Sequence, residues 1–481
     1  MSTQHPDNVK QPFFVENSIV KGDDEIKEAF YAFSHLKIQE QLWDAEGKEV
    51  DNFVVEKLLS RYSDYFKKHK LGQDRFITVR GPNPRVEKNM GKMLLEILEG
   101  IPRNFDIANK FYKEDIAPIF EVAIPMVSSS NEITRVKKYY DNHVIGKSFA
   151  KVGDIKLNDW VGEFKPKQIN VIPLIEDRDS MLNAHNIVSE YMGNVNVKEY
   201  QRVWLARSDP ALNYGNLSAI LVNRIALQRL HKLEETSSVD IYPMIGCGSA
   251  PFRGNFKPGN EKNVLNAYPS MQTFTMQSAF KYDYDESDVV KAVDFVNKTK
   301  RKNPNFVEEN YALEIIKKVS DNYKEQIVEI APLVNKMSRF IPQRRKRKLH
   351  VGLFGYSRES DGVSLPRAIK FTASLYSLGL PPEILGLNNL NEKDWDFIHQ
   401  NSGVNLDLID AMKYYNKDNL FIFSQKIQNQ VKQTIKNLNF ELDIDHKHKK
   451  VTGFVLKDFS SGNMEIGENI ERAASIRKFL G

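Results

Sequence analysis

Acidic side chains follow two apolar runs that the sequence predicts to be buried strands. Glu176 and Asp177 come after one of these runs, and Asp209 follows another, within Arg207-Ser-Asp-Pro. Reactive groups cluster at the carboxyl ends of parallel strands, and carboxylates held there supply the oxygen ligands that Mg²⁺ or Mn²⁺ prefers. Glu176 and Asp209 are therefore candidate metal ligands. The structural alternative is that Asp209 caps the next helix and that Glu176 pairs with a nearby arginine.

Arginines occupy similar positions at or after the ends of predicted elements. The five that do so are Arg80, Arg207, Arg253, Arg358 and Arg367. A guanidinium group binds phosphate or carboxylate through two hydrogen bonds, so several converging arginines predict a small substrate with two anionic groups. Ion pairing at the rim of the sheet would explain any single one of them, but it explains five less readily.

Two weaker signals lie elsewhere in the chain. The run Gly246-Cys-Gly-Ser-Ala-Pro-Phe-Arg-Gly254 is rich in small residues, so its backbone could approach an anion closely, although such turns are frequent. His5 lies in a polar N-terminus; it could act as a general base, although a frayed tail is the simpler interpretation.

The basic run Arg344-Arg-Lys-Arg-Lys348 could suggest nucleic-acid binding. It stands directly before an apolar run and has no aromatic residues interleaved with it. The start of a strand in contact with water, or a subunit contact, is therefore the favoured interpretation.

The elements that must position these side chains follow an alternating pattern. Continuous apolar runs are typical of strands buried on both faces of a parallel sheet, and they occur at 76–80, 118–125, 170–176, 203–209, 241–246, 272–276 and 349–354. Two segments with helical spacing accompany these runs. One is 53–66, which is followed by Gly72, and the other is 217–233. We expect an α/β fold, a (β/α)8 barrel embedded in a mostly α-helical body. The chain after Gly362 is expected to be largely helical.

Composition narrows the class of protein. The 481 residues carry a formal charge of only +5, which does not favour a nucleic-acid or membrane partner. The single cysteine, Cys247, excludes an internal disulfide. No apolar stretch approaches the roughly 20 residues of a membrane helix, and no secretory signal is recognisable. We therefore expect a cytoplasmic protein.

The order of several motifs along the chain resembles that of the archaeal-type phosphoenolpyruvate carboxylases. These motifs are Met-Ser-Thr-Gln-His-Pro-Asp-Asn at the start, 43–51, 205–215, 248–254, 278–283, 344–358, 364–369 and the final Phe-Leu-Gly. Together they span essentially the whole chain. The resemblance implies a single catalytic domain over 1–481, an elaborated barrel with extra helices.

The resemblance also implies roles for particular residues. His5 stands at the position of the family's catalytic histidine, next to the bicarbonate. Glu176 and Asp209 match the ligands of Mg²⁺ (or Mn²⁺), and Arg253 matches the glycine-loop arginine that stabilises the carboxylation step. The arginines that match those around the substrate phosphate are Arg80, Arg358 and Arg367.

The chain departs from the longer bacterial and plant form in three places. Cys247 replaces a second arginine of the glycine loop, and Leu212 replaces a lysine after the metal-binding aspartate. Phosphate binding is therefore expected to depend on other cations, first on Arg207 and then on Lys281. The C-terminus lacks the Asn that helps the longer form bind inhibitory aspartate, so the resemblance does not decide whether this protein is feedback-inhibited.

The function that the resemblance implies is a lyase reaction that fixes carbon dioxide. Bicarbonate adds to phosphoenolpyruvate, giving oxaloacetate and inorganic phosphate through carboxyphosphate and a metal-stabilised enolate. A homotetramer is implied as well. Two alternatives stay open: a metal-dependent barrel lyase acting on oxaloacetate or a related pyruvate-forming substrate, and a nucleic-acid-binding protein that uses the basic run.

Overall fold

Seven parallel strands form the central sheet of the structure, a computed structural model that describes residues 6–45, 51–345, 358–360, 363–400, 403–438, 440–463 and 465–481. The strands follow one another in the order β1-β2-β3-β6-β7-β8-β9, which is their order along the chain. Their bounds are β1 Glu40–Asp44, β2 Phe76–Arg80, β3 Glu121–Ile124, β6 Asn170–Ile175, β7 Tyr200–Ala206, β8 Asp240–Gly246 and β9 Thr273–Thr275. Consecutive parallel strands require crossovers, and these are mostly helical.

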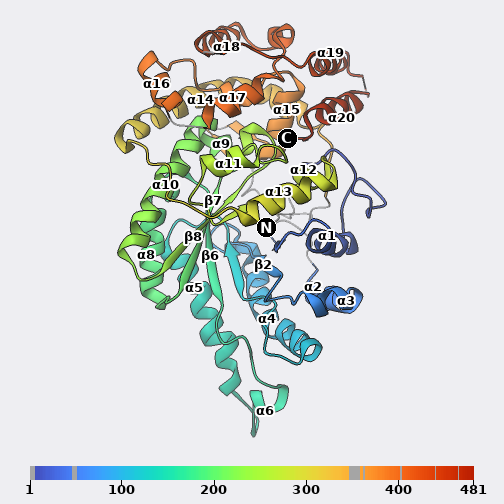
Figure 1. The fold of residues 1–481 in the computed structure, drawn as a ribbon, viewed down its shortest axis with the longest axis vertical. Coiled ribbons are helices and arrows are strands. Elements are labelled where there is room, and N and C mark those ends of the chain that lie inside the picture. The colour runs from blue at the N-terminus through green and yellow to red at the C-terminus, as the bar shows by residue number, and fades with distance from the viewer. Residues whose placement is uncertain are drawn as a thin grey trace.

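The helices cover the sheet and extend beyond it (Figure 1). Those up to β9 are α1 Asp23–Ser34, α2 Val54–Arg61, α3 Ser63–Lys68, α4 Gly91–Tyr112, α5 Ser130–Tyr139, α6 Leu157–Val161, α7 Arg178–Leu182, α8 Ala184–Val195, α9 Ser208–Tyr214, α10 Asn216–Thr236 and α11 Glu261–Ala267. Those after it are α12 Ser278–Tyr282, α13 Glu286–Lys298, α14 Glu309–Met337, α15 Ala368–Ser377, α16 Glu392–Gln400, α17 Val404–Met412, α18 Gln425–Asn437, α19 His446–Ser461 and α20 Ile466–Arg477. In Figure 1, α18 and α19 lie at the end of the molecule opposite the tip that carries α6. Two short antiparallel pairs of strands are separate from the central sheet: β4 Lys151–Val152 with β5 Ile155–Lys156, and β10 Arg358–Ser360 with β11 Val363–Leu365.

Both faces of the sheet are buried. Successive side chains of a strand point to opposite faces, so alternate residues join different apolar clusters. Val203 and Leu205 of β7 join the large core under the helices, whereas Trp204 and Ala206 join a second apolar cluster. The members of this second cluster come from five strands: Leu42, Ala123, Ile172, Leu174, Trp204, Ala206 and Met244. A single inner cluster fed by alternate residues of so many strands is the arrangement found inside a barrel.

The α/β architecture with a parallel sheet is confirmed. Six of the predicted apolar runs contain strands of this sheet, and the seventh run, 349–354, lies outside the described residues. The strand β1 was not among the predicted runs. Closure of the seven described strands into an eight-stranded barrel therefore stays a prediction.

The helical predictions hold with one change. The segment 217–233 lies within α10, and the chain after residue 362 is largely helical in the part that the structure describes. The segment 53–66 is divided at Tyr62, so α2 and α3 are separate helices. No helix in the described ranges is long and apolar enough to span a membrane.

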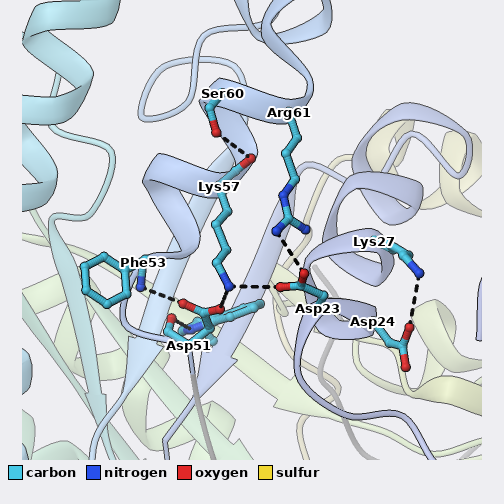
Figure 2. A network of polar contacts seen from close by, with 9 residues as sticks. Asp23, Asp24, Lys27, Asp51, Phe53, Lys57, Ser60 and Arg61 are labelled. Carbon is cyan, nitrogen blue, oxygen red and sulfur yellow. Dashed lines mark hydrogen bonds and ion pairs between the residues drawn. The ribbon is translucent and has the colours of Figure 1, made fainter.

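Polar contacts on the surface connect α1 to α2 (Figure 2). Asp23 in the first turn of α1 accepts hydrogen bonds from Lys57 and Arg61 of α2, both at 2.9 Å. Lys57 also contacts the carboxylate of Asp51. These contacts lower the pKa of Asp23, with the Lys57 hydrogen bond as the main cause. The Asp23 side chain is 51% exposed, so the ion pairs stabilise the fold only weakly.

Candidate active site

A cavity of about 450 Å³ lies at the carboxyl ends of the central strands. Its apolar floor includes Leu174, Trp204 and Ala206 of the inner cluster. Among the residues that the structure describes, its charged lining is strongly unbalanced, because six arginines and one lysine accompany two carboxylates: Arg80, Arg207, Arg253, Arg344, Arg345, Arg367 and Lys370, with Glu176 and Asp209. Such a cavity favours a small molecule that carries several negative charges.

The two carboxylates reach the cavity from neighbouring strands. Glu176 directly follows β6, and Asp209 lies in the first turn of α9, which follows β7. The pairing of Leu174 with Trp204 brings the ends of these strands together. Both side chains are partly exposed, so their oxygens are accessible to ligands in the cavity.

The capping alternative for Asp209 is not what the structure shows. The N-cap position of α9 is taken by Arg207, two residues earlier. At the end of β6 it is Asp177 that caps a helix, since its side chain accepts a hydrogen bond from the amide of Ser180 at 2.9 Å. Glu176 and Asp177 are neighbours in the sequence, but their side chains have different surroundings. Glu176 lines the cavity, whereas Asp177 caps α7.

The donor set fits Mg²⁺ or Mn²⁺. Hard cations of this size are commonly held by one or two carboxylates and complete their shell with waters and substrate oxygens. Glu176 and Asp209 supply two such carboxylates beside a cavity that is large enough for the remaining ligands. Within the described residues no group of three or more histidine, cysteine, aspartate and glutamate side chains could hold a metal by itself. The site would therefore be an open one that shares its cation with a substrate.

Arg80 is held in place by a carboxylate on the adjacent strand. It ends β2 directly opposite Asp44 at the end of β1, and its Nε donates to Asp44 Oδ1 at 2.8 Å, while Nη2 contacts the other oxygen. Both side chains are buried. The guanidinium also lies 5.7 Å from the ring centre of Trp204 on the cavity floor. This bidentate pair fixes the direction in which Arg80 faces the cavity.

The glycine-rich loop after β8 brings Arg253 to the cavity. Gly254 has φ of 118°, and a Cβ there would meet the Cys247 sulfur at 2.8 Å, so this position requires glycine. Cys247 itself is fully buried, and burial raises the pKa of its thiol to about 12. It therefore supplies no charge to the loop.

Leu212 is also buried, in the core under α14, where its carbonyl accepts a hydrogen bond from Tyr323.

The remaining predicted residues differ in what they contact. Arg207 is 1% exposed and lines the cavity, and it also donates to the Phe252 carbonyl of the glycine loop at 3.2 Å. Arg367 lines the cavity at the start of α15. Lys281 is not brought to the cavity lining; its ammonium donates to Glu28 at 3.0 Å in a fully buried pair.

Two of the predicted site residues have side chains that lie outside the described part of the chain. His5 lies outside the described residues, although the next residue, Pro6, lines the cavity. Arg358 begins the short strand β10, and its side chain lies outside the described part of the chain. Their roles stay predictions.

The interpretation of the basic run as a solvated segment is wrong for its first two residues. Arg344 and Arg345 are 5% and 3% exposed, and both line the cavity. Arg344 pairs with Glu471 of α20 at 2.8 Å, and Arg345 pairs with Glu25 and Glu28 of α1. These partners are more than 100 residues away in the chain, so no local pattern in the sequence could reveal them.

Other lining residues were missed by the sequence analysis. Lys370 extends the set of cations, and Ser208 and Gln277 add neutral hydrogen-bonding groups. Ser208 directly precedes Asp209, and Gln277 directly follows the segment 272–276, so position at a strand end was the signal that could have identified them.

Glu383 contacts the glycine loop through the Phe252 amide and should make the stability of the protein depend on pH. Its carboxyl group accepts hydrogen bonds from the Tyr376 hydroxyl at 2.6 Å and from the Phe252 amide. Burial raises its pKa to about 8. Such a group contributes stability below its ordinary pKa near 4.5, and this contribution is lost as the pH rises through about 8.

The Glu383→Gln variant should therefore lose less stability than the wild type between pH 6 and pH 9. The difference is expected to be at most about 3 kcal/mol, because only about two pH units separate pH 6 from the pKa of about 8, and each corresponds to about 1.4 kcal/mol. Apparent melting temperatures at the two pH values, with the exposed Glu392→Gln as control, would measure it. Equal pH dependence in wild type and Glu383→Gln would show that this carboxyl group is not the cause.

Fold and site together define a class: an α/β enzyme with a parallel-strand edge, a two-carboxylate site that fits a divalent cation, and arginines for a small polyanion. Comparison with known proteins agrees with this class. The family model described as "Phosphoenolpyruvate carboxylase" matches residues 1–481. The chain belongs to the phosphoenolpyruvate carboxylase family.

Archaeal relatives support the family assignment over the full length. A phosphoenolpyruvate carboxylase of Methanospirillum hungatei is 48% identical over 485 residues, covering 100% of this chain and 99% of the relative. Those of Methanothermobacter thermautotrophicus and Halobacterium salinarum are 48% and 45% identical over 484 and 492 residues, with the same coverage.

Proposed function

We propose that the protein carboxylates phosphoenolpyruvate with bicarbonate, giving oxaloacetate and inorganic phosphate. The observation that carries this proposal is the cavity that combines Glu176 and Asp209 with six arginines at one end of the parallel sheet. Phosphoenolpyruvate carries a phosphate and a carboxylate, and bicarbonate adds a third anion. A cavity with this charge balance suits all three.

The reaction would proceed in two stages. Bicarbonate attacks phosphorus, so a new phosphorus–oxygen bond forms while the bond to the enol oxygen breaks, giving carboxyphosphate and the enolate of pyruvate. Carboxyphosphate then loses its proton to a base, for which His5 is the candidate, and separates into carbon dioxide and phosphate. The nucleophilic carbon of the enolate finally bonds to carbon dioxide, forming oxaloacetate.

The chain's own residues have separate tasks in these stages. Arg80 and Arg367 would hold the phosphate, and the rigid Asp44 contact keeps Arg80 directed at it. Arg253 would hold the carboxylate that forms in the second stage. The apolar floor around Trp204 limits the access of water, which would otherwise protonate the enolate to pyruvate.

Glu176 and Asp209 would hold the divalent cation. Bound there, Mg²⁺ or Mn²⁺ would supply positive charge to the phosphate and the enol oxygen as negative charge develops on them.

A substitution of Arg367 tests the binding of the substrate phosphate. Arg367→Gln should raise the KM for phosphoenolpyruvate by about 10- to 100-fold, the effect of losing one charged hydrogen-bonding partner. Steady-state kinetics would measure the change, with Arg85→Gln as control, since Arg85 is a half-exposed arginine that pairs with Glu132. A KM equal to that of the wild type would remove Arg367 from the phosphate site.

The lyase alternative is not favoured. A metal-dependent lyase of oxaloacetate would use the same carboxylates, but it would need neither the ring of arginines nor bicarbonate. The nucleic-acid alternative is not supported by the first two residues of the basic run, because Arg344 and Arg345 are buried and paired with acidic side chains; residues 346–348 lie outside the described part of the chain.

Three finer features complete the proposal. An eighth strand at 349–354 would close the barrel, and Arg345 forms a parallel bridge with Val20 just before that segment. A homotetramer is proposed from the family resemblance, and the mass of the protein in solution would test it. A cytoplasmic location is proposed from the features of the sequence given above.

A further inference from the structure

The segment after Pro6 is built into the wall of the cavity. Asp7 is 0% exposed, its carbonyl accepts a hydrogen bond from the Leu480 amide at 2.7 Å, and its Oδ1 accepts one from the Ala279 amide at 2.6 Å. The other oxygen, Oδ2, lies 3.2 Å from Nη1 of Arg253. A carboxylate near the N-terminus thus pairs with the arginine of the glycine loop, 246 residues further along.

Arg253 is constrained at all three of its nitrogens. Besides Asp7, Nη1 contacts the carbonyl of Gly481, Nη2 contacts Oε1 of Gln277, and Nε donates to Ser208 at 3.3 Å. The backbone of Gly248 packs against the guanidinium, since a Cβ there would meet Arg253 Cζ at 3.0 Å. The side chain is 2% exposed and yet lines the cavity. Its orientation is therefore set by its neighbours and not by the flexible aliphatic stem.

Asp7 is the acidic member of this set. Asp209 also lies close enough to Arg253 to favour its charged form, but Asp209 is committed to the candidate metal site. Gln277 contributes an amide oxygen, Gly481 contributes a main-chain oxygen, and Ser208 contributes a hydroxyl. Removing the charge of Asp7 would leave a buried guanidinium without the carboxylate side chain that contacts its Nη1, which favours another orientation of the side chain.

We infer that Asp7, assisted by Gln277, is a positioning residue that aims the Arg253 guanidinium at the carbon dioxide fragment. This inference rests on the proposed function. If Arg253 holds that fragment beside the enolate, its orientation decides between two fates of the same intermediate. With the fragment held, the enolate carbon bonds to carbon dioxide and forms oxaloacetate. With the fragment released, the enolate takes a proton from water and forms pyruvate, while phosphate has already been produced in both cases.

The measurement that tests Asp7 is the ratio of oxaloacetate to phosphate in one reaction. The wild type should give a ratio near one. Asp7→Asn should turn over phosphoenolpyruvate about 10- to 100-fold more slowly, and its phosphate should exceed oxaloacetate at least about twofold, with the excess recovered as pyruvate. A loss of turnover with the ratio still near one would overturn the inference, because a merely structural defect lowers both products together.

Asp283→Asn is the matched control. Asp283 accepts hydrogen bonds from the amides of Val9 and Lys10 at 2.7–2.8 Å, so it anchors the same segment two residues further on. If Asp7 acts through Arg253, Asp283→Asn should keep the ratio near one. An equal shift of the ratio in both variants would mean that Asp7 only anchors the segment, which contradicts the inference.

Gln277→Leu keeps the test valid if Asp7→Asn does not fold. It removes the acceptor of the other terminal guanidinium nitrogen and should shift the ratio in the same direction, to a smaller extent. Suppose that Asp7→Asn does not fold, or that it forms oxaloacetate and phosphate in equal amounts. An oxaloacetate-to-phosphate ratio of one in Gln277→Leu as well would then overturn the inference. Failure of the proposed function is distinguishable, since it would appear in the wild type as the absence of oxaloacetate.

Discussion

Glu176→Gln is expected to lower the rate of oxaloacetate formation by about 10²- to 10⁴-fold at saturating phosphoenolpyruvate. The amide keeps the size of the side chain but loses the charge and one of the oxygen ligands for the cation. With Asp209 as the remaining carboxylate among the described lining residues, the affinity for Mg²⁺ should fall as well. Calorimetric titration with Mn²⁺ would measure the affinity independently of activity.

Asp177→Asn is the control for this experiment. Asp177 is the next residue in the chain and carries the same charge, but it caps α7 through the Ser180 amide. Asparagine caps helices about as well as aspartate does, so activity should change less than about twofold. Equal losses in the two variants would contradict the assignment of Glu176, because the effect would then come from charge near the strand end and not from a ligand.

Glu28→Gln is expected to destabilise the protein by about 3–5 kcal/mol, the largest effect on stability that the structure predicts. Its two carboxylate oxygens contact Lys281 at 3.0 Å, Tyr282 at 2.8 Å and Arg345 at 2.6 Å, all of them buried. Burial opposes the ionisation of Glu28, but Arg345 and Lys281 outweigh it and hold its pKa well below the usual range. Without this charge the buried Lys281 and Arg345 would both lose a carboxylate partner, while Arg345 would keep its contact with Glu25. Chemical denaturation or the apparent melting temperature would measure the loss.

The control for Glu28 lies on the same helix. Asp23→Asn removes a carboxylate of α1 that also contacts two cations, Lys57 and Arg61, but at the surface (Figure 2). Its expected cost is about 1 kcal/mol or less. Because the folded-state pKa of Glu28 is lowered, the stability it contributes is present above its unfolded pKa and is lost only as the pH falls through the lowered value. Comparable losses in the two variants would contradict the buried network.

The sequence predicted the strands that are apolar throughout. The runs at 76–80 and 241–246 correspond closely to β2 and β8, because mostly apolar runs without strict alternation are typical of strands buried on both faces. The strand β1, with the sequence Glu-Gln-Leu-Trp-Asp, has polar residues at three of its five positions. Their burial is made possible by partners on other strands, such as Arg202 for Glu40, which no local pattern contains.

The candidate site was predictable where it depends on position at a strand end. Glu176, Asp209 and Arg253 could be identified in this way, and the structure places all three around one cavity. The surroundings of Lys281 and Arg345 could not be predicted, for a common physical reason. The sequence shows that both are cationic, but their environment is set by Glu28, which lies more than 250 residues away in the chain.

The most direct test of the central claim is oxaloacetate formation from phosphoenolpyruvate, coupled to malate dehydrogenase, with bicarbonate and Mg²⁺ each present or removed. The proposal predicts turnover only when both are present, complete loss of it after addition of a chelator, and recovery when excess Mg²⁺ is restored. Turnover that persists without bicarbonate, or the absence of oxaloacetate from folded protein with both components present, would contradict it.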